Sequence, residues 1–220
     1  MACCDVNGID RIFRGNLVTQ EKRAFLKNGL NERQQGFFEQ VAPTDKTVLD
    51  IGCGVGALGT SALQQGAREA VFVDVSRAYL AAARGVVEYF NLSDRASFQQ
   101  GDFTDLSVRA ADLVTLDRVV CCYPDATRLL EKAAAHSRHD LVFSYPRPTW
   151  WLRAGRTLLN LGVSVFGQRY RFYLHDEKTL LDAAQSAGHV LRHRARHGLW
   201  QVLVLSRSER SAPKNLETNW

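Results

Sequence analysis

The segment that most constrains the fold is residues 48–59, Val-Leu-Asp-Ile-Gly-Cys-Gly-Val-Gly-Ala-Leu-Gly. Its first residues are apolar and β-branched, which predicts a short buried strand. The glycines that follow allow a sharp turn, and a backbone without Cβ atoms lets a ligand approach closely. The pattern beyond them predicts a helix whose N-terminal amides point toward that ligand. This order of strand, glycine turn and helix indicates a ligand-binding α/β sheet.

The rest of the chain alternates in the same way. The expected strands are 46–51, 70–75, 96–100, 112–117 and 140–145; the expected helices are 57–66, one capped by Ser76 and ending near Phe90, 125–136 and 150–166. Such alternation predicts a parallel sheet with helices on both faces. A helix over 177–187 and a hairpin of strands 189–196 and 199–206 complete the pattern. The predicted fold is a Rossmann-like, seven-stranded, mostly parallel α/β sheet with a final antiparallel hairpin.

The N-terminal part of the chain is predicted to be α-helical. Thr19 and Asn31 are expected N-caps, and Gln34 follows Asn31 at the spacing of a capping box. The polar composition of the C-terminus predicts disorder. The expected organisation is a helical segment (1–45), a sheet domain (46–206) and a disordered tail (207–220).

The charge balance excludes some classes of partner. The net charge is +5 over 220 residues, which is mildly basic and not the pattern of an obligate nucleic-acid binder. Three arginines, Arg192, Arg194 and Arg196, would share one face of a strand. This strand is expected at the edge of the sheet, where charge prevents edge-to-edge pairing. Edge protection is therefore favoured as the reason for the arginines, over RNA binding by an RNA methyltransferase. No stretch is long and apolar enough to predict a membrane span.

Five cysteines, an odd number, occur without any C-x-x-C spacing: Cys3, Cys4, Cys53, Cys121 and Cys122. This usage is typical of reduced thiols in a cytoplasmic protein rather than of a disulfide framework. Vicinal pairs are a poor spacing for structural zinc, so no metal site is predicted. No signal peptide is apparent, and a cytoplasmic location is expected.

Two ligand classes fit the glycine turn. Gly54-x-Gly56-x-x-Gly59 matches the dinucleotide fingerprint, and Asp74 follows at a spacing that suits a ribose in either class. Asp50, however, precedes the glycines, where a carboxylate would repel a pyrophosphate and attract an ammonium group. Together with Gly101-Asp102-Phe103, this segment resembles the first motifs of class I S-adenosylmethionine (SAM) methyltransferases. An NAD(P)-binding oxidoreductase is the less favoured alternative, and a non-catalytic protein of the same fold is a third.

The resemblance implies SAM as the cofactor and assigns its contacts. Asp50 and Gly52 would surround the methionine part. Asp74 would accept the ribose hydroxyls, and Asp102 would accept from the adenine amino group. Other implied cofactor contacts are Cys53, Gly54, Gly56, Val75, Ser76, Phe103, Asp117 and Arg118.

Further segments are similar to magnesium-protoporphyrin O-methyltransferases: Gly8–Phe13, Val119–Pro124, Phe143–Tyr145 and Tyr173–His175. This resemblance implies a lid made by residues 1–45 and 146–175. The chain departs from that family at Cys122, which stands where the family has a histidine. The departure, with Asp117 facing the methyl group, favours an indole (for example in a cyclic dipeptide) or phenol acceptor in specialised metabolism. Carboxyl O-methylation of a tetrapyrrole-like acceptor is the alternative.

Asp117 is the first candidate for a catalytic base or orienting acceptor, because a phenol or indole gains from proton removal whereas a carboxylate does not. His175 and Tyr145 are alternatives. The substrate-binding candidates are Arg11, Phe13, Cys122, Trp150, Tyr170 and Tyr173.

Overall fold

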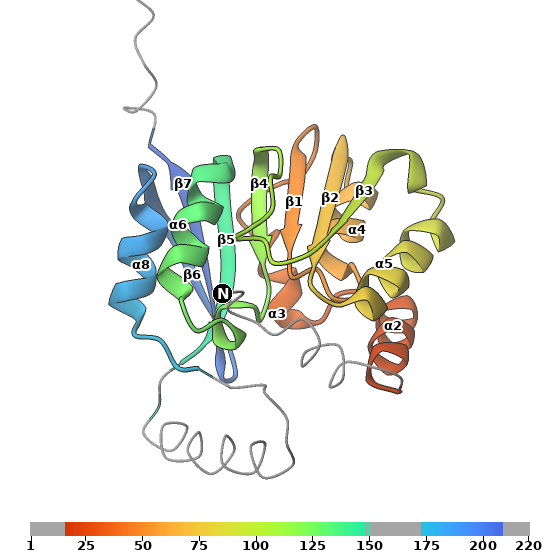
Figure 1. The fold of residues 1–220 in the computed structure, drawn as a ribbon, viewed down its shortest axis with the longest axis horizontal. Helices are drawn as coiled ribbons and strands as arrows, with labels where there is room; N and C mark the ends of the chain where they lie inside the picture. Colours follow the sequence, from red (N-terminus) through yellow and green to blue (C-terminus); the bar gives the residue numbers. More distant parts are fainter. Residues whose placement is uncertain (1–15, 148, 150–172, 209–220) are drawn as a thin grey trace, which may run out of the picture.

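The computed structural model describes residues 16–147, 149 and 173–208, which contain a seven-stranded sheet (Figure 1). The strands are β1 (Thr47–Ile51), β2 (Glu69–Asp74), β3 (Ala96–Gln100), β4 (Ala111–Leu116), β5 (Ser137–Pro146), β6 (His189–His197) and β7 (Trp200–Arg207). Their order is β3-β2-β1-β4-β5-β7-β6. The first five are parallel, whereas β7 pairs antiparallel with both β5 and β6. The predicted fold class is confirmed.

Helices cover both faces of this sheet (Figure 1). They are α2 (Asn16–Asn28), α3 (Glu32–Gln35), α4 (Ala57–Gln64), α5 (Arg77–Tyr89), α6 (Ala126–His136) and α8 (Glu177–Gln185), with short 3₁₀ turns η1 (Ser93–Arg95) and η2 (Val120–Cys122). The alternation of β5 divides the core: Leu141 and Phe143 pack with α6 and α8, whereas Val142 packs with α4 and α5. Among the described residues, no helix has both the length and the apolar character needed to span a bilayer.

The N-terminal caps were predicted with mixed success. Asn31 caps α3 in a reciprocal capping box with Gln34, as expected: each backbone N–H donates to the other side chain, at 3.1 and 3.2 Å. The expectation for Thr19 was wrong, because Thr19 lies inside α2. That helix is positioned by its buried residues Val18 and Phe25, seven residues apart on one face.

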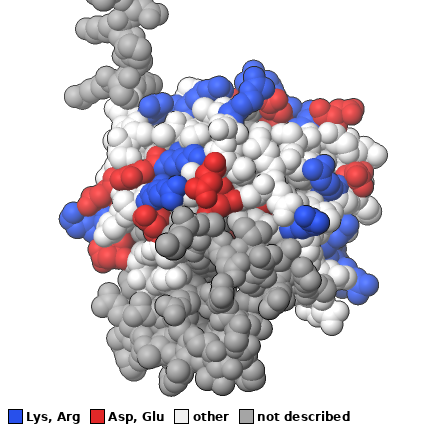
Figure 2. All heavy atoms as spheres, in the orientation of Figure 1, with Lys and Arg blue, Asp and Glu red and all other residues white. Residues whose placement is uncertain are grey.

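The arginine-rich strand β6 lies at the edge of the sheet, as predicted. Arg192, Arg194 and Arg196 are exposed on one face, and Arg194 forms an ion pair with Glu177. Figure 2 shows Lys and Arg interspersed with Asp and Glu over the described part of this side of the molecule. The exposure of these arginines on the edge strand supports an edge-protecting role for their charges. Arg207, expected in the tail, is the last residue of β7.

Gly59 is a packing requirement of α4. A Cβ atom at this position would overlap the ring of Phe72, which is fully buried and stacked on Phe98. We expect Gly59→Ala to destabilise the protein by about 1–3 kcal/mol, the usual cost of overpacking a core. Chemical denaturation measures this.

The matched control is Gly85→Ala in α5, where the new Cβ would meet only the flexible end of the Lys22 side chain. Alanine is preferred over glycine inside a helix by roughly 0.5–1 kcal/mol, so this variant should be neutral or stabilised. Equal destabilisation of both variants would contradict the packing argument.

Candidate active site

A cavity of about 410 Å³ lies over the carboxyl ends of the parallel strands. Gly52 after β1, Asp74 and Val75 at the end of β2, and Gly101 after β3 form its walls. Ligands of open α/β sheets bind at this edge, because successive loops converge there. The glycine turn and the ends of the two neighbouring strands, which the sequence predicted to lie together, therefore line the same cavity.

The glycine turn adopts the left-handed backbone that its sequence predicted. Gly52, Gly54 and Gly56 have φ angles of 63°, 55° and 78°, which are strained for other residues. At Gly52 a Cβ would also overlap the side chain of Val119. Gly56 is the N-cap of α4 and lines neither of the two cavities described here.

Asp74 organises the ends of β1 and β2 beside the cavity. One carboxylate oxygen accepts from the Gly54 N–H at 2.9 Å, and the other accepts from the Ser76 N–H at 2.8 Å. The residue is 8% exposed, so its carboxylate is held firmly at the cavity surface. Ser76 is fully buried beneath it and caps α5 by accepting from the Tyr79 N–H.

Asp102 is surrounded by donors. Its carboxylate accepts from the Thr104 N–H at 2.9 Å, from the Thr104 hydroxyl at 3.0 Å and from the Tyr123 hydroxyl at 3.0 Å. Phe103 is buried next to it and lines the cavity. The contacts of Thr104 and Tyr123 were not predicted from the sequence, although Tyr123 lies within a segment that carried the family resemblance.

Asp50 lies below the turn and lines a second cavity of about 280 Å³, together with Cys53. Its carboxyl oxygens accept from the Thr115 hydroxyl at 2.9 Å and from the Gly59 N–H at 3.1 Å. Burial raises the pKa of Asp50 to about 7, against the lowering effect of these hydrogen bonds. Burial, reinforced by Asp74 and Asp50, also raises the pKa of the Cys53 thiol.

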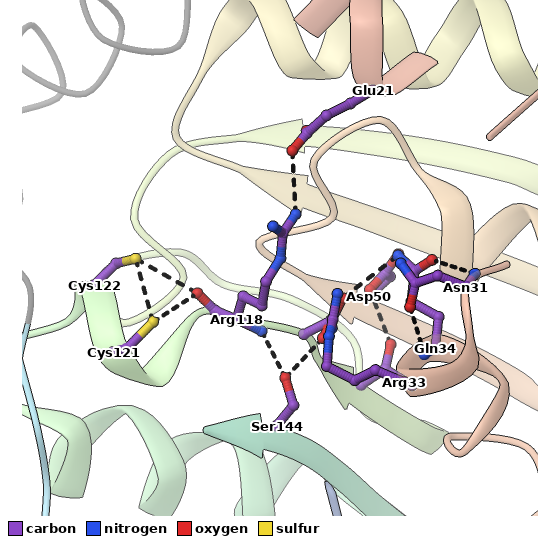
Figure 3. A network of polar contacts seen from close by, with 11 residues as sticks. Glu21, Asn31, Arg33, Gln34, Asp50, Arg118, Cys121, Cys122 and Ser144 are labelled. Atoms are coloured by element: carbon purple, nitrogen blue, oxygen red, sulfur yellow. Dashed lines mark hydrogen bonds and ion pairs between the residues drawn. The ribbon is translucent and has the colours of Figure 1, made fainter. Parts of the chain in front are cut away.

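Asp117, at the end of β4, lines both cavities. It belongs to a polar network that includes Arg33, Arg118 and Ser144 (Figure 3). Its carboxylate forms an ion pair with Arg33 and accepts from the Ser144 hydroxyl at 2.7 Å. The same hydroxyl accepts from the Arg118 N–H at 2.9 Å. Burial and the nearby charge of Arg118 lower the pKa of Arg33 to about 10, so it remains a cation at neutral pH.

The N-terminal helices close one side of the site. Glu21 of α2 accepts from the Tyr79 hydroxyl at 2.9 Å and pairs with Arg118 at 3.2 Å (Figure 3). Trp200, at the start of β7, also lines the larger cavity, and the Arg33 guanidinium lies 5.4 Å from its ring centroid. Sequence reasoning did not single out Glu21, Arg33 or Trp200, because their partners lie far away along the chain.

Three of the predicted catalytic or substrate-binding residues line neither of these cavities: Tyr145, Tyr173 and His175. Among the predicted cofactor contacts, Ser76 and Gly56 do not line them either. The buried Tyr145 donates to Glu177 at 2.5 Å, and burial with this contact raises its pKa. His175 bonds the Tyr123 carbonyl at 2.9 Å, and burial lowers its pKa. The structure therefore places Tyr145 away from the catalytic position suggested for it. Cys122 and Arg118 do line the larger cavity; Arg11, Phe13, Trp150 and Tyr170 lie outside the described residues.

Residues 48–140 match a family model described as a methyltransferase domain. This segment runs from β1 into β5 and contains four of the acidic residues of the site: Asp50, Asp74, Asp102 and Asp117. The family match favours methyl transfer over the dinucleotide interpretation of the glycine turn.

Solved structures support the same fold. The structure of magnesium protoporphyrin IX methyltransferase from Synechocystis PCC 6803 with bound SAH aligns with a TM-score of 0.70 at 21% identity, covering 93% of this chain and 100% of that one. An O-methyltransferase family protein from Burkholderia thailandensis aligns with a TM-score of 0.70 at 17% identity, covering 90% and 62%. With the strand order, these similarities establish the Rossmann-like methyltransferase fold.

The similarity in sequence to curated proteins is short. Ribosomal protein L11 methyltransferase from Escherichia coli O8 (strain IAI1) is 44% identical over 52 residues, which is 24% of this chain. The match spans only 18% of that protein, about a fifth of its length. It therefore supports the methyltransferase match without extending to the rest of that protein.

Proposed function

We propose that this chain transfers the methyl group of SAM to a small planar aromatic or heteroaromatic molecule. The observation that carries the proposal is the cavity of about 410 Å³, where two buried carboxylates, Asp74 and Asp102, meet the glycine turn within the segment that matches a methyltransferase domain. A nicotinamide cofactor is disfavoured by Asp50, since a pyrophosphate would approach a carboxylate there.

The residues fit the parts of SAM. Asp74 suits a ribose diol, because a carboxylate can accept about four hydrogen bonds and this carboxylate lies in the cavity wall at the end of β2. Asp102 and Phe103 suit an amino-substituted ring. The smaller cavity, between the carboxyl of Asp50 and the guanidinium of Arg118, suits the zwitterionic amino-acid end.

The chain's own contribution is mainly to position the reactants. When bound, SAM supplies an electrophilic methyl group on a sulfonium. Holding an acceptor in line with that methyl can account for roughly 7–11 kcal/mol of the barrier. Asp117 lines both cavities and is already ion-paired with Arg33, so we assign it the role of orienting an acceptor N–H or O–H.

An indole or phenol acceptor, in specialised metabolism, is supported by Trp200. Trp200 lines the larger cavity and offers an aromatic surface on which a flat molecule can stack. A second candidate is carboxyl O-methylation of a tetrapyrrole-like acceptor. The observation in its favour is the alignment over the entire Synechocystis chain.

The test is incubation with trideuteromethyl-SAM and pooled indoles, cyclic dipeptides, phenols and porphyrins, followed by mass spectrometry. A product labelled on an indole or phenol supports the proposal, and a labelled porphyrin ester supports the second candidate. Isothermal titration with S-adenosylhomocysteine is the accompanying measurement. Absence of binding would refute the methyltransferase function itself.

Asp117→Asn distinguishes orientation from proton transfer, with circular dichroism to establish that the variant is folded, because the substitution leaves the buried Arg33 without its anion. With an orienting role we expect kcat/KM to fall by roughly 10- to 150-fold and its pH profile to keep its shape, since one charged hydrogen bond contributes about 1.5–3 kcal/mol. Ser144→Ala, which removes the hydroxyl that donates to Asp117, should act in the same direction more weakly. A fall of roughly 10²–10⁴ in kcat with an altered pH profile would instead make Asp117 the base.

A further inference from the structure

Two adjacent cysteines lie together in the wall of the larger cavity. Cys121 and Cys122 end the 3₁₀ turn η2, and their Sγ atoms are 3.7 Å apart. Both thiols point at the Arg118 carbonyl oxygen, at 3.3 and 3.5 Å (Figure 3). In a strand, neighbouring side chains would point to opposite faces, so it is the tight turn that aims both sulfurs the same way. Nothing in the proposed methyl transfer requires this pair.

The pair is poorly suited to forming a disulfide with itself. Adjacent Cα atoms are about 3.8 Å apart across a trans peptide, below the roughly 4.4–6.8 Å that disulfides normally span. The pKa of Cys121 is raised, mainly by the hydrogen bond with Cys122 and secondly by burial. The Cys121 sulfur is therefore a neutral thiol at neutral pH. A neutral thiol oxidises slowly, because the thiolate is the reactive form.

The pair is also poorly suited to zinc. Structural zinc takes four ligands in a tetrahedron. In residues 16–147, 149 and 173–208, no group of three or more His, Cys, Asp or Glu side chains could hold a metal ion. A ligand for this pair must therefore be a thiophilic element that needs only two sulfur ligands from the protein.

We propose that Cys121 and Cys122 form a dithiol site for trivalent arsenic compounds. Arsenic(III) is thiophilic and bonds three groups, so two sulfurs and one group of its own complete its shell. A bridging atom also keeps the sulfurs farther apart than a direct S–S bond would, which suits their present separation. The inference does not depend on the methyltransferase proposal.

The product suits its surroundings. With phenylarsine oxide, the arsenic forms two As–S bonds, the As=O bond breaks, and the oxygen leaves as water with the two thiol protons; the arsenic stays trivalent. The product carries no charge, so its burial requires no counter-ion. The cavity offers apolar walls to the phenyl group at Val119, Tyr123 and Leu129.

The experiment uses the full chain with Cys3→Ser and Cys4→Ser, because that second vicinal pair could bind the same probe. One equivalent of phenylarsine oxide is added, and the intact mass is measured before and after an excess of free dithiol. We expect one phenylarsenic unit per chain, reversed by the dithiol. Cys121→Ser or Cys122→Ser should each lower the affinity by roughly 10²–10⁴-fold, because the second bond is then no longer intramolecular.

Cys53→Ser is the matched control and should keep the adduct, since Cys53 lines the other cavity. A second measurement keeps both cysteines of η2 in place, so its result does not depend on the folding of the serine variants. Tryptic cleavage after Arg118 and Arg128 isolates both thiols in peptide 119–128, and the arsenical should protect both from iodoacetamide. The proposal is overturned if no adduct forms, if either serine variant retains it, or if peptide 119–128 is alkylated as fast with the probe as without it.

Discussion

Replacing Asp74 by alanine is expected to lower the affinity for S-adenosylhomocysteine by about 100-fold or more. Hydrogen bonds to a charged group contribute about 1.5–3 kcal/mol each, and a ribose diol offers two. The side chain also holds the N–H groups of Gly54 and Ser76, so the glycine turn loses two of its fixed points. Isothermal titration measures the affinity, and circular dichroism confirms that the variant is folded.

The matched control is Asp105→Ala. Asp105 carries the same carboxylate group but lies outside both cavities. Its exposed side chain pairs with Arg128 at 2.9 Å. An isolated surface pair contributes little, about 0–1 kcal/mol, so binding should be unchanged. If a folded Asp74→Ala protein bound the ligand within a few-fold of the parent, the assignment of Asp74 to the ribose would be wrong.

Asp50→Asn is expected to stabilise the protein at pH 8 by up to about 4 kcal/mol. The pKa of Asp50 is about 7 in the folded protein, compared with an ordinary value of 3.8, and burial is the main cause. Between these two values the unfolded chain loses its proton before the folded protein does. Stability therefore falls as pH rises from about 4 to 7, by about 1.4 kcal/mol per unit, and the loss persists above pH 7.

An asparagine at position 50 does not ionise, so the variant should lack this fall. Its amide can still accept one of the hydrogen bonds that Thr115 and Gly59 donate. Denaturant unfolding at several pH values measures the effect. Asp112→Asn is the control, because the backbone and side-chain hydrogen bonds of Thr47 outweigh burial and lower the pKa of Asp112. That control should retain the fall between pH 4 and 7; an equal fall in Asp50→Asn would contradict the assignment.

The parts of the site that the sequence predicted are those set by local chemistry. The strand and glycine turn at 48–59 follow from residue type alone, and the capping box at Asn31 joins residues three apart. Asp74 and Asp102 were found because parallel strands bring their carboxyl ends to one edge. Spacing along the chain was enough in each case.

The parts of the site that the sequence did not predict are contacts between elements that lie far apart along the chain. Gln34 and Asp117 are 83 residues apart, and no periodic pattern indicates that α3 packs over the end of β4. Tyr145, a catalytic candidate from the sequence, lies outside both cavities for a different reason. Neighbouring side chains of a strand point to opposite faces, so Ser144 points toward Asp117 and Tyr145 points toward α8. The alternation of β5 predicts this difference, whereas the motif that contains both residues does not.

The ion pair between Arg33 and Asp117 sets a condition for engineering this protein. It joins the N-terminal helices to the strand end where the acceptor is expected, so neither half of the site is an independent module. A chimera that imports a foreign N-terminal segment would leave Asp117 without its cation, and a change at position 117 would leave Arg33 buried without its anion. Variation of acceptor preference should therefore proceed by paired exchange of both positions, with the two substitutions introduced in a single step.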